Sequence, residues 1–111
     1  MSWDIMLVRT ETNTEPMEKI NEGNTIPFIS SDVVSTLKEH FPNITEESPD
    51  WLDYEGSTFS INFSLATTDS IMLFVHIFDE PEDAVMPMIH ELCTLFNCRA
   101  FDTTTAEFIV T

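Results

Sequence analysis

The sequence predicts an α+β fold in which two helices alternate with four strands. Residues 57–65 alternate between apolar and polar side chains, as a strand with one buried face does. Residues 70–78 are apolar on both faces, which is typical of a central strand. Residues 30–42 and 79–97 instead carry apolar side chains at helical spacing, so we expect helices there.

The chain is expected to begin with a strand at residues 3–9, because "WDIMLVR" is apolar and alternates loosely. Residues 10–29 are polar and contain Pro16, Gly23 and Pro27, which predicts a long loop. A loop of that length is uncommon in a small domain and is often functional or partly disordered.

For the first helix, we expect Ser30 or Ser31 to cap the N-terminus and Asp32 to favour the positive end of the helix dipole. Pro42 ends the helix. Its apolar face is Val33, Val34, Leu37 and Phe41.

The second helix has acids and prolines at its start, where both are tolerated. Its apolar stripe is Val85, Met88, Ile89, Leu92, Leu95 and Phe96. Residues 99–110 close the chain as the fourth strand, with a bend or bulge at the three threonines of residues 103–105.

The order β-α-β-β-α-β is the ferredoxin-like, split βαβ pattern. Right-handed crossovers then give a four-stranded antiparallel sheet of order 4-1-3-2 with both helices on one face. With 111 residues, the chain fits one domain spanning residues 1–111. In this topology the loop of residues 42–56, the loop of residues 79–83 and Asp4 share one end of the domain, and their carboxylates would converge there.

Charge is the most unusual property of the composition. Twenty acidic residues face four basic ones, giving a net charge of −16. Such a chain has little with which to neutralise phosphates, so direct binding to nucleic acid or to an anionic membrane is excluded. Solubility alone would explain a charge of about −2 to −8. We therefore expect a cationic partner, whose encounter the charge would accelerate.

The stretch "EESPDWLDYEG" (residues 46–56) places two aromatic side chains among five carboxylates. One interpretation is a solvated loop whose Trp51 docks on the core. The other is a binding site for a basic protein, in which aromatic anchors are buried and carboxylates pair with Lys or Arg. The predicted partner-binding residues are Glu46, Glu47, Asp50, Trp51, Asp53, Tyr54, Glu55, Asp79, Glu80, Glu82 and Asp83.

The sequence offers little for catalysis. Its candidate bases are His40, His76 and His90, without Cys or Asp partners at ligand spacing, and a lone histidine is more often packed or in contact with a partner. No nucleophile elbow, phosphate-binding loop or zinc motif occurs, so we expect no enzyme. If Met72, Phe74, His76 and Phe78 lie on an uncovered sheet face, they form an apolar patch that marks an interface; the pattern leaves open which face is covered.

No metal, cofactor or membrane segment is expected. "DEPED" (residues 79–83) lacks the glycine and the final glutamate of a calcium loop. Cys93 and Cys98 are too far apart along a continuous helix to bridge easily, so we expect free thiols, as in a reducing compartment. No stretch of 18 apolar residues occurs, and "MSWDIMLVRT" lacks a signal peptide's basic region, so we expect a cytoplasmic protein.

Three segments resemble a family of small acidic bacterial proteins: "DSIMLFV" (69–75), "ELCTLFNCRAFDTTTAEFI" (91–109) and, less closely, "WDIMLVR". Here Cys98 replaces the tryptophan that the family pattern favours. Ala106 replaces a glycine, which makes a sharp turn with positive φ unexpected at that position. Some members resemble immunity proteins encoded beside polymorphic or contact-dependent growth inhibition toxins.

The resemblance and the charge together predict an immunity protein that neutralises a basic toxin domain, such as an RNase or another nuclease, by covering its cationic active site with carboxylates. We expect a monomer or weak dimer when the protein is free. Two alternatives remain: a nucleic-acid mimic that inhibits a nucleic-acid enzyme or a repressor, and a small regulatory ligand-binding domain of ferredoxin-like fold. The mimic would require rows of charge, and the regulatory domain a pocket between dimerised sheets.

Overall fold

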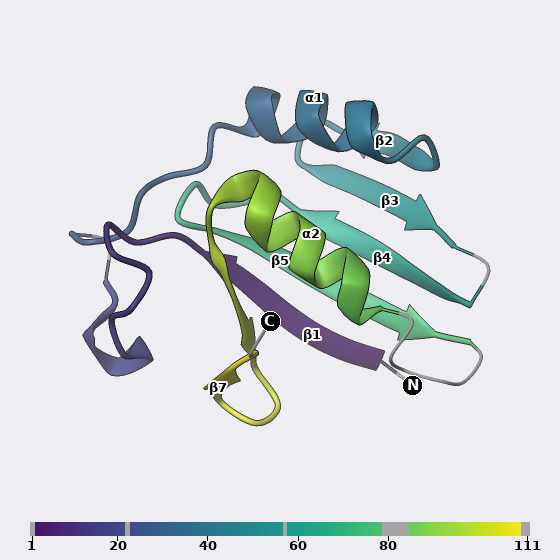
Figure 1. Cartoon of the computed structure of the whole chain (residues 1–111). Coiled ribbons are helices and arrows are strands. Elements are labelled where there is room, and N and C mark those ends of the chain that lie inside the picture. The colour runs from purple at the N-terminus through teal and green to yellow at the C-terminus, as the bar shows by residue number, and fades with distance from the viewer. Residues whose placement is uncertain (1, 22, 57, 79–84, 110–111) are drawn as a thin grey trace.

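The computed structural model describes residues 2–21, 23–56, 58–78 and 85–109. Two α-helices lie on one side of a seven-stranded antiparallel sheet (Figure 1). The predicted α+β class is confirmed, but the four-stranded ferredoxin-like sheet is wrong in its strand number. The elements are β1 (Ser2–Val8), a 3-10 helix (Met17–Lys19), α1 (Ser30–His40), β2 (Ile44–Ser48), β3 (Trp51–Glu55), β4 (Phe59–Ser64), β5 (Ser70–Ile77), α2 (Met86–Phe96), β6 (Arg99–Asp102) and β7 (Glu107–Phe108).

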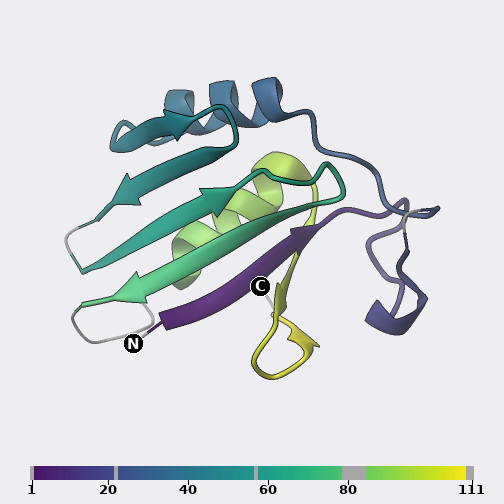
Figure 2. The ribbon, with the colours of Figure 1, turned by 180° about the vertical axis from the view of Figure 1, so that it is seen from behind.

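The strands lie in the order β2-β3-β4-β5-β1-β6-β7. The four predicted strands correspond to β1, β4, β5 and β6. They lie side by side in the predicted order, which is β6-β1-β5-β4. The hairpin of β2 and β3 extends the sheet at one edge, and β7 extends it at the other. Figure 2, from behind, shows the sheet in front of both helices, so one sheet face has neither described helix over it.

The β2–β3 hairpin replaces the loop predicted for residues 42–56. Leu52 is the residue that ties the hairpin to the core, since its side chain is fully buried and it pairs with Phe63 of β4. The many acids in this stretch hide the alternation, because only Ile44, Leu52 and Tyr54 are apolar at the positions that face inward.

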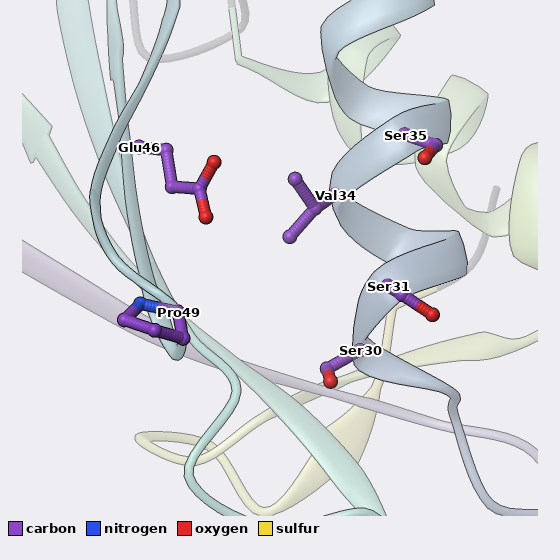
Figure 3. Close-up of a pocket in the computed structure, with 6 residues that line it drawn as sticks. All are labelled: Ser30, Ser31, Val34, Ser35, Glu46 and Pro49. Atoms are coloured by element: carbon purple, nitrogen blue, oxygen red, sulfur yellow. The ribbon is translucent and has the colours of Figure 1, made fainter.

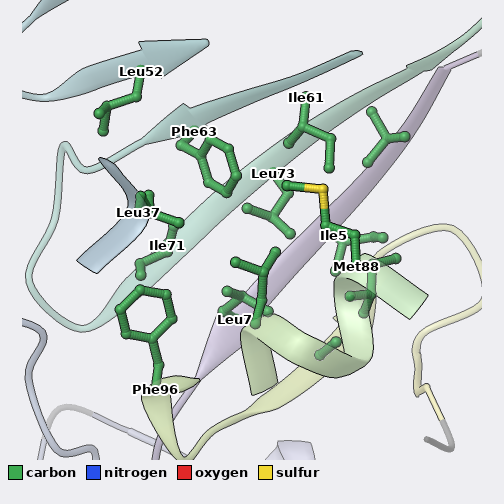
Figure 4. Packing of buried hydrophobic residues seen from close by; sticks show 14 of the residues in the cluster. Ile5, Leu7, Leu37, Leu52, Ile61, Phe63, Ile71, Leu73, Met88 and Phe96 are labelled. Carbon is green, nitrogen blue, oxygen red and sulfur yellow. The ribbon is translucent and has the colours of Figure 1, made fainter. Parts of the chain in front are cut away.

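The core lies between the sheet and the helices (Figure 4). β5 alternates strictly, with Ile71, Leu73, Val75 and Ile77 buried, although its sequence is apolar on both faces. The stripe predicted for the second helix also packs here: Val85, Met88, Ile89, Leu92 and Phe96 are buried, and Leu95 is half-buried. Burying such side chains is the main stabilising contribution, about 1.5–3 kcal/mol each.

The helix ends differ from those predicted. In α1, Ile29 occupies the N-cap position, and no side chain caps the helix, so the expected cap by Ser30 or Ser31 is wrong. α2 begins at Met86, and the earlier part of its predicted range, residues 79–84, lies outside the described residues.

The end of α2 brings the two cysteines together. Asn97 adopts a left-handed conformation with φ of 49°, and the Cys98 N–H donates to the Cys93 carbonyl oxygen at 3.0 Å. Both thiols are free, as expected. However, the assumption of a continuous helix is wrong, and the thiols are neighbours. A hydrogen bond between them lowers the pKa of Cys93 and, together with burial, raises that of Cys98.

The predicted closing strand is divided into a short hairpin by a turn at the three threonines, where a bend was expected. β6 and β7 are joined by a turn in which Asp102 Oδ1 accepts a hydrogen bond from the Thr104 N–H at 2.9 Å. Ala106 has φ of 58°, so the expectation against positive φ at that position is wrong. Its N–H donates to the Asp102 carbonyl oxygen at 2.9 Å, which holds the turn despite the Cβ.

The segment of residues 10–29 is tied to the body of the protein. A β-bridge joins Thr10 to Thr25. The guanidinium of Arg9 donates to the Pro27 carbonyl oxygen at 2.7 Å, and that of Arg99 donates to the Glu15 carbonyl oxygen at 2.9 Å. Two of the four basic side chains therefore serve internal structure.

Candidate functional site

Strand alternation divides the acidic stretch between two faces of the sheet. Trp51, Asp53 and Glu55 alternate with Leu52 and Tyr54 along β3. The Tyr54 ring lies on the core side, with its centroid 6.0 Å from that of Phe41 and 5.8 Å from that of Phe59. Trp51 and Tyr54, both predicted as aromatic anchors of one binding site, therefore lie on opposite faces of the sheet.

The sheet register also separates the stretch lengthwise. Glu55 pairs with Ser60, which in turn pairs with His76 near the end of β5. At the opposite end of the sheet, by contrast, the backbone carbonyl oxygen of Asp50 accepts a hydrogen bond from the Leu65 N–H. The prediction that the whole stretch gathers at one end is therefore wrong. The remaining predicted residues, Asp79, Glu80, Glu82 and Asp83, lie outside the described residues.

Glu46 faces α1 rather than the open side. Its carboxylate forms an ion pair with Lys38 Nζ at 2.8 Å, the only ion pair among the described residues. Glu46 and Pro49 border a groove of about 340 Å³ against the first two turns of α1, which contribute three serines and Val34 (Figure 3). This groove is open and carries no cluster of three potential metal ligands within the described chain.

The structure decides which face of β5 is uncovered. Met72 and Phe74 are half-buried and His76 and Phe78 exposed, whereas the alternate residues are buried under the helices. This patch, whose side the sequence left undecided, lies on the sheet face that no described helix covers, which we call the open face (Figure 2).

A row of mainly apolar side chains crosses the open face. Cross-strand pairing places one residue from each of six strands in this row, which we call the open-face band. All six are half-buried. The band is Trp51, Ser64, Met72, Met6, Phe101 and Phe108.

The next row of the open face is more polar. Asp53, Asn62, Phe74 and Asp4 pair successively across β3, β4, β5 and β1. Two carboxylates thus border the open-face band at separate positions. An apolar strip with charged groups along its side is the composition of a protein-binding surface.

Trp51, Asp53 and Phe74 form a compact unit on this face. The Trp51 and Phe74 rings stack, with centroids 5.9 Å apart and planes 19° apart. The Trp51 Nε1–H donates to Asp53 Oδ1 at 3.0 Å, and Asn62 Nδ2 donates to the same oxygen. His76 Nε2 lies 3.0 Å from Asn62 Oδ1, so His76 donates to the amide oxygen. This chain of hydrogen bonds fixes both the carboxylate and the indole.

The histidines occupy different settings. His40 and His90 are exposed on the helices, and His76 contacts an amide. An amide oxygen accepts a hydrogen bond but is not a proton-transfer partner, so the His76 arrangement suits orientation and contact. That the chain is not an enzyme stays a prediction.

Comparison of the chain with protein-family models, with curated proteins and with solved structures finds no match. The resemblance to immunity proteins therefore stays an expectation. Neither described helix has the length and apolar character needed to span a bilayer.

Proposed function

We propose that this chain is a binding protein that neutralises a basic partner domain, in the manner of an immunity protein acting on a cytoplasmic toxin nuclease. The observation that carries the proposal is the open face, where a band of half-buried, mainly apolar side chains adjoins Asp53 and Asp4. Large apolar patches edged by polar groups are typical of protein-binding sites.

The charge of the chain indicates the kind of partner. At −16, a second copy of this chain would bring like charge onto Asp53 and Asp4, which disfavours stacking of two open faces. A basic domain would be attracted instead. Arg9 and Arg99 are used internally, and the described residues form a single ion pair, so most of the described carboxylates have no cationic partner.

The proposal moves the contact surface away from the acidic loops favoured by the sequence. Of the predicted binding residues, Trp51, Asp53 and Glu55 belong to the open face, and these are retained. Glu46 and Tyr54 are engaged on the helix side, so we assign them structural roles.

The test uses the C-terminal domain encoded by the gene immediately upstream, expressed in cells with this chain. Met72→Glu puts a charge in the open-face band, and we expect it to abolish protection from that domain. The matched control is Ile29→Glu, because Ile29 is 63% exposed at the start of α1, on the helix side. Full protection by the Met72 variant, or equal loss with the Ile29 variant, would contradict an interface on the open face. A chain that forms a stable homodimer through this face would also contradict it.

A further inference from the structure

Asp53 has an unusual position for a carboxylate on a sheet surface. It is half-buried, and its Oδ1 accepts hydrogen bonds from both Trp51 and Asn62. Each carboxylate oxygen offers about two acceptor positions, so Oδ1 is fully used. No hydrogen bond within the described part of the chain reaches Oδ2.

The aromatic stack beside Asp53 depends on the small residues of β4. Trp51 belongs to β3 and Phe74 to β5, and β4 lies between them. Ser64 pairs with Trp51, and Asn62 pairs with Phe74. Because these two side chains are short, the indole extends across β4 to the phenyl ring. The result is a rigid aromatic surface joined by a hydrogen bond to a carboxylate.

No basic side chain of the described residues forms an ion pair with the Asp53 carboxylate. Arg9 and Arg99 bind backbone carbonyl oxygens and lie over Phe28 and Phe108, at 4.7 Å and 3.9 Å from the ring centroids. Lys38 pairs with Glu46 on the helix side. Both arginines thus show how this chain accommodates a guanidinium, between oxygen acceptors and an aromatic ring.

We propose that Asp53, together with the Trp51–Phe74 stack, is a recognition site for an arginine side chain of the partner. The inference rests on the proposed function and names the partner group that the open face takes. The guanidinium donates to Asp53 Oδ2 while its plane lies against the aromatic surface. Guanidinium is favoured over the ammonium of lysine because it is planar, is more weakly hydrated and stacks on aromatic rings.

Asn62 and His76 are positioning residues for this site. His76 donates to Asn62 Oδ1, which directs the amide Nδ2–H groups toward Asp53. The carboxylate is therefore held before the ligand arrives, which reduces the entropy lost on binding. Asn62→Ala should weaken arginine binding without removing the charge of Asp53.

The experiment titrates the intact chain with a short arginine-rich peptide and with the matched peptide in which lysine replaces each arginine. The readouts are the dissociation constant and the shift of the Trp51 indole N–H resonance, assigned with Trp51→Phe. We expect the arginine peptide to bind about tenfold more tightly and to move that resonance. Asp53→Asn should remove the preference. Asp32→Asn is the control, because it removes an equal charge from an exposed site on α1.

Equal affinity for the two peptides, or equal losses in the Asp53 and Asp32 variants, would overturn the inference, since binding would then reflect only the net charge. The folded state of Asp53→Asn is checked by the Trp51–Phe74 contact in the same spectra. The failures of the two proposals are distinguishable. If the chain shows no preference for the arginine peptide but Met72→Glu still abolishes protection, only the arginine site is rejected. If the chain prefers the arginine peptide but does not protect cells from the upstream-encoded domain, only the immunity function is rejected.

Discussion

The indole of Trp51 on β3 stacks on the ring of Phe74 on β5 across the full width of β4. The contact connects the β2–β3 hairpin, which was not predicted from the sequence, to the central strand β5. It also buries part of two aromatic rings on a face that neither α1 nor α2 covers.

We predict that the two rings are energetically coupled. In a double-mutant cycle of Trp51→Ala and Phe74→Ala, the coupling free energy of unfolding should be about 0.5–1.5 kcal/mol, the range for aromatic pairs. Urea unfolding of the four proteins measures it. If the two substitutions change the free energy of unfolding additively, the rings are close together but not energetically coupled.

Gly56 should tolerate no side chain. A Cβ there would lie 2.6 Å from the backbone oxygen of Phe59, the same oxygen that accepts a hydrogen bond from the Gly56 N–H. We expect Gly56→Ala to lower the free energy of unfolding by about 1–3 kcal/mol. Gly23→Ala is the control, because its Cβ would meet only the Asn21 side chain, at 3.0 Å, and it should cost under about 0.5 kcal/mol. Similar losses in the two variants would contradict the close approach at Gly56.

Glu15 should make stability depend on acid pH. Hydrogen bonds, first from the Thr12 hydroxyl and also from Thr10 and the Thr14 N–H, lower the pKa of Glu15 from 4.5 to about 2. Because the folded-state pKa is depressed, the contribution is complete above pH 4.5 and is lost as the pH falls toward 2. The difference in free energy of unfolding between the natural chain and Glu15→Gln should shrink over that interval. A difference independent of pH would mean that the carboxylate charge does not hold this segment.

The two cysteines should differ in reactivity. The thiol–thiol hydrogen bond lowers the pKa of Cys93, so an aromatic disulfide reagent should label Cys93 before Cys98. Cys98→Ala removes that hydrogen bond and should slow the labelling of Cys93. With diamide as the oxidant, both thiols should lose their hydrogens and join in one intramolecular disulfide. First labelling of Cys98, or only intermolecular products by mass spectrometry, would contradict the contact.

The sequence contained enough to predict the helices and the central strands, because their apolar spacing follows directly from which side chains are buried. It did not reveal β2 and β3, since β2 is a short edge strand with acids at two of its five positions and only Leu52 of β3 is fully buried. The candidate site was predicted only in part: several of its residues were named, but not their arrangement on one sheet face. Trp51 and Tyr54 are close in sequence, but strand geometry sends them to opposite faces.

The candidate site also depends on long-range register, which local patterns do not encode. Trp51 and Phe74 are brought together by the pairing of β3 with β4 and of β4 with β5. His76 was recognised as a residue that would contact a partner if its face were uncovered, and the open face provides that condition. Which sheet face the helices cover depends on the packing of the whole chain and cannot be read from one strand's sequence.

The most direct test of the central claim is a methyl spectrum of the chain with its methionines labelled, recorded with and without the upstream-encoded domain. Met6 and Met72 lie in the open-face band, whereas Met88 belongs to α2 and is buried in the core on the other side of the sheet. Binding of a basic domain to the open face should shift the Met6 and Met72 methyl signals strongly and leave Met88 nearly unchanged. A complex that forms while Met6 and Met72 keep their free positions would place the interface elsewhere and contradict the account.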